Sequence, residues 1–130
     1  MAYLKEKFVL LRKALKAWDK VLIEPYSEIV RDATIQRYEF SCELFWKCVK
    51  IFLKEYEGID CNSPKSCFRA LKGILKLTEK DVLLCLEMVD DRNLSVHTYS
   101  EALAKALYRR TRRYFEVVKR IFAEIEGRVS

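Results

Sequence analysis

Glycine and proline are scarce in this chain of 130 residues, which contains three glycines and two prolines. Their scarcity excludes collagen-like repeats, flexible linkers and low-complexity disorder. It also argues against a many-stranded β domain, which needs a turn signal every ~8–12 residues. The length fits one domain over residues 1–130, since domains usually contain roughly 100–200 residues.

Long hydrophobic runs are missing as well. No apolar stretch approaches the ~18 residues of a membrane span. The first residues, Met1 to Lys7, carry several charges and lack the hydrophobic core of a secretory signal. We therefore expect a soluble, cytoplasmic protein that does not bind a membrane.

The sequence has five cysteines but a single histidine, His97, and no Cys-x-x-Cys pair. A structural zinc site needs four nitrogen or sulfur ligands, usually in closely spaced pairs. Cys61 and Cys67 lie near each other in an expected turn, but we expect no disulfide between them in a reducing cytosol. The other three cysteines fall among apolar helical positions and should be small core residues: Cys42, Cys48 and Cys85. We expect neither a metal nor a cofactor.

Basic residues outnumber acidic ones by 25 to 19, which gives a net charge of +6. This excess permits a polyanionic partner, because neutralising phosphates dominates nucleic-acid affinity, but a solvated helical surface has a similar composition. The densest basic run is Arg109-Arg110-Thr111-Arg112-Arg113. Its side chains wrap around a helix, so both a solvated face and an RNA contact remain open.

Apolar residues recur at helical spacings of three and four through most of the chain. The first predicted helix covers residues 2–22, and the second covers Ser27 to Tyr56 and ends at Gly58. The second is apolar on several faces, which is typical of a central helix or a subunit interface. Tyr38 and Trp46 should belong to the core.

Start signals place three further helices. Ser63 and Pro64 open a short one, and Thr78 with Asp81 forms a capping box before the fourth. The last begins at Ser100 and should close at Gly127. The predicted fold is all-α, an antiparallel four-helix-type bundle with an extra short helix.

The segment from Asp90 to Tyr99 holds groups that packing does not explain. On an ideal helix Arg92 and His97 would be about 140° apart, so they share a site only if the helix loosens around residues 95–97. His97 could then move protons at a 2′-hydroxyl, and Arg92 could clamp a phosphate. Asn93 could orient the substrate. Such groups suit RNA cleavage without a metal.

Other contacts of the same groups are open. Asp90 and Asp91 could hold Arg92 in place. In a purely structural alternative, Arg92 pairs with Asp91 or Glu87, and His97 caps a helix end. Ion pairs and caps also produce such clusters.

The spacing from Arg92 to His97 matches the R-x4-H signature of HEPN domains, with the polar Asn93 after the arginine. Tyr99 extends it to the R-x4-H-x-Y form of HEPN toxins that are paired with a minimal nucleotidyltransferase. Residues 31–40 and 43–47 resemble the second helix of this family, which is also called the nucleotidyltransferase substrate-binding protein family. The resemblance spans about residues 4 to 125.

This resemblance implies a homodimer in which Arg92 and His97 of both copies meet in a shared cleft. It implies a toxin that cuts RNA (tRNA or mRNA) without a metal and leaves a cyclic phosphate. A cognate minimal nucleotidyltransferase antitoxin would silence it by transferring AMP to Tyr99. The family also contains non-catalytic binding subunits, so a subunit that presents substrate to a nucleotidyltransferase is the alternative.

The charges of the second helix allow two interpretations. Glu43 and Lys47 have the favourable order of an i,i+4 pair on a solvated face. Alternatively, Arg31 and Asp32 contribute to the dimer cleft or contact the nucleotidyltransferase.

Overall fold

The computed structural model describes residues 2–98 and 100–129, and within these ranges it contains helices and no strand. The helices are α1 (Ala2–Leu22), α2 (Glu28–Glu57), α3 (Pro64–Leu75), α4 (Glu79–His97) and α5 (Glu101–Val129). The predicted all-α bundle, with four longer helices and one short one, is confirmed.

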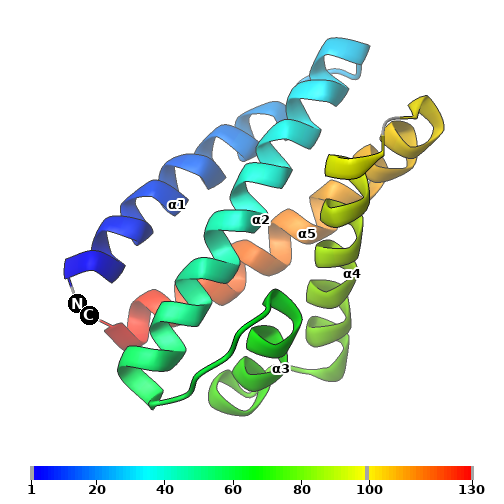
Figure 1. Cartoon of the computed structure of the whole chain (residues 1–130). Coiled ribbons are helices and arrows are strands. Elements are labelled where there is room, and N and C mark those ends of the chain that lie inside the picture. Colours follow the sequence, from blue (N-terminus) through cyan, green and yellow to red (C-terminus); the bar gives the residue numbers. More distant parts are fainter. Residues whose placement is uncertain (1, 99, 130) are drawn as a thin grey trace.

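The longer helices α1, α2 and α5 pack against one another, and α4 lies against α2 and α5 (Figure 1). The short α3 packs against α2 and α4. We call the end where α2 and α5 begin the upper end of the bundle. The start of α1 and the end of α5 lie together at the opposite end (Figure 1).

Side-chain caps explain where most helices begin. Ser27 accepts a hydrogen bond from the Val30 amide, and Ser63 and Thr78 each take part in a capping box. These caps satisfy amide groups that have no partner inside the helix. The predicted starts at Ser27, Ser63 and Thr78 are therefore confirmed.

Glycine was a good guide to one helix end and a poor guide to another. Gly58 ends α2 in the left-handed region at φ 66°. The prediction that Gly127 closes the last helix is wrong, because α5 continues to Val129. Gly127 does not adopt the positive φ that lets glycine end a helix.

The core is built around aromatic side chains. Trp18 is fully buried between Tyr38 and Phe115, with ring centroids 5.7 and 5.2 Å away. Tyr38 also stacks on Tyr114, which joins α2 to α5. Tyr38 is thus a core residue as predicted, and Trp46 is partly buried against the same core.

The cysteines fall into two groups. Cys42, Cys48 and Cys85 are buried and free, as predicted for small core residues. Burial raises the pKa of each thiol to about 12. The expectation that Cys61 and Cys67 remain unpaired is wrong, because they form a disulfide whose Cα atoms are 5.2 Å apart. The chain folds back here from the end of α2 into α3, which brings the two residues together.

Candidate functional site

A buried polar network fixes the second half of α4. The Asp91 carboxylate accepts hydrogen bonds from Arg110 Nη1 at 2.8 and 2.9 Å and from the Tyr114 hydroxyl. Burial and the bond to Asp91 raise the pKa of Tyr114, so its hydroxyl stays protonated as the donor. The Tyr38 hydroxyl donates to the Met88 carbonyl at 2.5 Å. These bonds fix the rotation of α4 about its axis.

Arg92 points toward α2. Its Nη2 lies 3.1 Å from Oε2 of Glu43, and its Nη1 lies 3.4 Å from the Asn93 side-chain oxygen. The Nε atom is buried without a hydrogen-bond partner. About 29% of the side chain is exposed, so a ligand can still reach the guanidinium.

The expected support of Arg92 by its two preceding acids is not what the structure has. Asp90 pairs with Lys65 of α3 at 2.6 Å, and Asp91 binds Arg110 and Tyr114. Consecutive residues on a helix point about 100° apart, so neighbours in sequence face different helices. Arg92 takes its partner from α2 instead.

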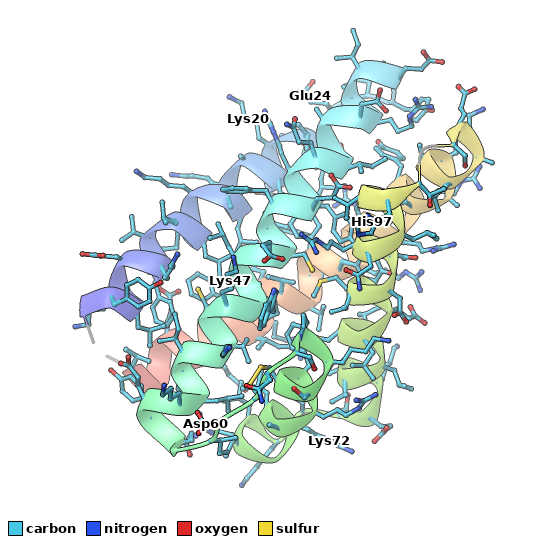
Figure 2. The ribbon with its side chains drawn as sticks, in the orientation of Figure 1. Lys20, Glu24, Lys47, Asp60, Lys72 and His97 are labelled. Carbon is cyan, nitrogen blue, oxygen red and sulfur yellow. A yellow bond between two sulfur atoms is a disulfide. The ribbon has the colours of Figure 1, made fainter. Side chains whose placement is uncertain are left out.

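His97 lies in the last turn of α4 and is exposed (Figure 2). The α4 helix continues through His97 to its C-cap at Thr98, so it does not loosen at residues 95–97. On one continuous helix Arg92 and His97 diverge by about 140°. A single protomer therefore holds both groups at one end of α4 but points them in different directions. Tyr99 lies outside the described residues.

Two glutamates of α2 contact this part of α4. Glu39 Oε2 accepts a hydrogen bond from the Ser95 hydroxyl at 2.6 Å, while Glu43 pairs with Arg92 and, at 3.1 Å, with Lys47. Burial acts to raise the pKa of Glu43. The hydrogen bonds from Lys47 and Trp46 and the charge of Arg92 outweigh it and hold this pKa below its ordinary value. Glu43 is therefore an anion at neutral pH.

Sequence reasoning missed these contacts from α2 to α4. Glu39 and Glu43 are one helical turn apart, which places them on one face of α2, but this spacing also fits a solvated face. The predicted pair of Glu43 with Lys47 is confirmed. The additional contacts depend on which helix packs beside that face.

Arg31 is buried at the start of α2. Its Nε donates to Asp32 at 3.0 Å, and its Nη1 lies 3.5 Å from Glu101 at the start of α5. The hydrogen bond from Asp32 is the largest influence on Arg31 and, with one from Tyr26, raises its pKa despite burial. Arg31 thus ties α2 to α5, while the Asp32 side chain is 58% exposed.

An open pocket of about 220 Å³ lies among the start of α2, the end of α4 and the start of α5. Its polar lining includes Asp32, Glu39, Ser95 and Thr98, and its apolar lining comes from α2 and α5. The pocket is next to His97 in the chain. Across the described part of the chain, no group of three or more His, Cys, Asp or Glu side chains is placed to hold a metal ion.

Taken together, one copy presents a phosphate-binding group, Arg92 with Asn93, and a titratable group, His97. The model of the family described as "Nucleotidyltransferase substrate binding protein like" matches residues 2–127. The chain belongs to this family. Its membership confirms that part of the sequence-based resemblance.

Solved structures support the same fold for this family member. A Thermus thermophilus protein shares 38% identity and a TM-score of 0.83, covering 88% of this chain and 98% of the other. No curated protein gives a significant match.

Two solved toxin–antitoxin structures have the same fold at 16% identity. A chain of a mutant MntA-HpeT pair gives a TM-score of 0.79 and covers 98% of this chain and 99% of its own. A chain of the tri-AMPylated Shewanella oneidensis HEPN toxin in complex with MNT antitoxin gives 0.73, covering 95% and 96%. None of the described helices is long and apolar enough to span a membrane.

Proposed function

We propose that this protein is the toxin of a toxin–antitoxin pair and a metal-independent endoribonuclease. The observation that carries the proposal is that Arg92, with a partly exposed guanidinium beside Asn93, and an exposed His97 occupy one end of α4. The fold is that of a HEPN toxin solved with its MNT antitoxin. Arg92 binds the scissile phosphate, His97 transfers protons, and Asn93 orients the substrate.

The proposed reaction needs only side chains of the protein. His97 takes the proton of a 2′-hydroxyl, and that oxygen attacks the adjacent phosphorus. Negative charge that develops on the phosphate oxygens is offset by Arg92. The bond from phosphorus to the 5′ oxygen breaks, an imidazolium returns a proton to that oxygen, and a 2′,3′-cyclic phosphate remains.

A second copy completes the proposed site. Because Arg92 and His97 diverge on one helix, a homodimer is needed to bring a phosphate-binding arginine and a histidine to one cleft. The active form acts on tRNA or mRNA in the cytoplasm. A cognate minimal nucleotidyltransferase silences it by moving AMP from ATP to the Tyr99 hydroxyl, with release of pyrophosphate. Asp32 and Arg31 lie where they could support this contact.

The direct test incubates purified, unmodified protein with bulk tRNA and mRNA in the presence of EDTA. We expect cleavage by the wild type and a loss of at least ~100-fold in His97→Ala, as removal of a general acid–base group typically costs. Arg92→Ala should lose a similar factor. Lys80→Ala, an exposed change in the first turn of α4, is the matched control and should cleave normally.

The same assay separates the second candidate, a non-catalytic subunit that presents substrate to a nucleotidyltransferase. The family description and the existing pairing of Arg92 with Glu43 favour this alternative. Absence of cleavage by unmodified wild type at every protein concentration, together with a stable nucleotidyltransferase complex, would support it. Cleavage that survives His97→Ala would refute the assignment of His97.

A further inference from the structure

The basic run of α5 does not form one surface. Arg110 is held by Asp91, and Arg112 Nη2 donates to the Leu22 carbonyl at the end of α1 at 2.7 Å. Arg113 lies beside Asp90 and Asp91 in a different pocket. Arg109 points elsewhere, so its surroundings indicate a separate role.

Arg109 lines an open pocket of about 340 Å³ together with Tyr26, Lys105 and Tyr108. Lys105, Tyr108 and Arg109 have helical spacings of three and four, which places them on one face of α5. Tyr26 reaches this face from the connection between α1 and α2. Its ring meets the Tyr108 ring edge to face at a centroid distance of 5.2 Å. We call these four residues the tyrosine–cation site.

The tyrosine–cation site is electropositive and open. Its lining contains two cations and no carboxylate, and Lys105 and Arg109 are both exposed. No ion pair within residues 2–98 and 100–129 involves either of them, in contrast to Arg110. The Tyr26 ring is 52% exposed although Tyr108 supports it from one side. A core residue or a structural ion pair would not leave these groups in this state.

Its position relates it to the proposed cleavage site. Both lie at the upper end of the bundle, where α2 and α5 begin (Figures 1 and 2). Lys105 belongs to the second turn of α5, and α5 begins four residues after His97. At a rise of about 1.5 Å per residue, Lys105 and Arg109 lie within roughly 12 Å of the start of α5.

We propose that the tyrosine–cation site binds single-stranded RNA and leads it toward His97. One base stacks on the exposed face of Tyr26, and the flanking phosphates contact Lys105 and Arg109. Stacking on an aromatic ring beside cations is how proteins hold single strands, whereas duplex RNA keeps its bases inaccessible. The inference rests on the proposed function in that RNA is taken as the polyanion.

The test measures binding of a short, fluorescently labelled single-stranded RNA by anisotropy, in full-length protein carrying His97→Ala so that no cleavage interferes. Adding Tyr26→Ala should weaken binding roughly 5- to 150-fold, the effect of losing one base stack. Tyr26→Phe keeps the ring and should bind as before. The double change Lys105→Ala with Arg109→Ala should weaken binding and reduce the salt slope by about 1.4, or about 0.7 for each phosphate that is no longer neutralised.

The matched control removes the same charge elsewhere. Lys54→Ala with Lys80→Ala changes two exposed lysines outside the tyrosine–cation site and should leave both affinity and salt slope near those of the parent. Equal losses in the two double variants would overturn the site, as would normal binding by Tyr26→Ala. Circular dichroism of each variant shows that the fold is intact.

Cleavage by the enzyme with His97 restored makes failures distinguishable. Cleavage that is unaffected by Tyr26→Ala refutes the tyrosine–cation site and leaves the nuclease intact. Binding that depends on Tyr26, in a protein that never cleaves, refutes the nuclease and keeps the site. Absence of RNA binding, with an acidic protein surface bound instead, refutes RNA as the ligand of the site.

Discussion

Among single residues, Glu43 decides how easily a phosphate reaches Arg92. Its pKa lies below the ordinary value, so the carboxylate remains charged until the solution is more acidic than the usual titration range of glutamate. A group whose pKa is lowered by folding stabilises the protein above its ordinary pKa and loses that contribution as the pH falls. Throughout the neutral range, a substrate phosphate therefore competes with Glu43.

Glu43→Gln should free Arg92 for substrate. Ion pairs at this degree of exposure contribute roughly 0.2–1 kcal/mol, so we expect RNA affinity to rise by up to about fivefold with little change in the unfolding free energy. The measurement is the dissociation constant of labelled RNA in the His97→Ala background. A weaker affinity would mean that Glu43 orients Arg92 productively instead of competing for it.

Among the helices, α3 ends at an unfavourable residue. Lys76 is its C-cap and adopts the left-handed conformation at φ 55°, the position where glycine is usual. A side chain in this region costs roughly 1 kcal/mol because Cβ crowds the backbone.

Lys76→Gly should therefore stabilise the protein by roughly 0.5–1 kcal/mol and raise the melting temperature by a few degrees. Lys76→Ala, which removes the charge but retains Cβ, is the control and should not stabilise. Thermal unfolding followed by circular dichroism measures both. Equal stabilisation by the two variants would assign the gain to the lost charge.

Helix starts were predictable from sequence because they depend on local chemistry. Ser27, Ser63 and Thr78 each satisfy amides within three residues of themselves. Helix ends were less so, since Gly127 can sit inside a helix when its φ is negative. The partners of Arg92 and Asp91 could not be predicted, because they come from α2 and α5 and depend on how α4 is rotated against them.

For the whole molecule, the proposed activity requires two copies. Phe40 is 60% exposed and lies one turn before Glu43 on α2, while Val96 is 47% exposed and lies one turn after Arg92 on α4. Apolar side chains beside the proposed cleft fit a surface that a second copy covers.

Phe40→Glu should separate the copies, because a carboxylate would be buried without a partner in the interface. We expect light scattering to give the monomer mass of 15.4 kDa for this variant and about twice that mass for the wild type. Cleavage should be lost together with the dimer. Leu83→Glu places the same charge on another exposed site of α4 and should remain dimeric and active. A monomeric wild type, or a dimeric Phe40→Glu protein, would contradict the shared cleft.

The Cys61–Cys67 bond has a consequence for how long the protein survives in the cell. The two residues are six apart in sequence and buried in the folded chain, so the bond acts mainly by restricting the unfolded chain. Closing so small a ring is worth about 2 kcal/mol in the chain-entropy model. Oxidising surroundings would leave the site near Arg92 unchanged but would make unfolded molecules rarer. Redox conditions would then set the lifetime of the protein, through its exposure to proteases, without changing its chemistry.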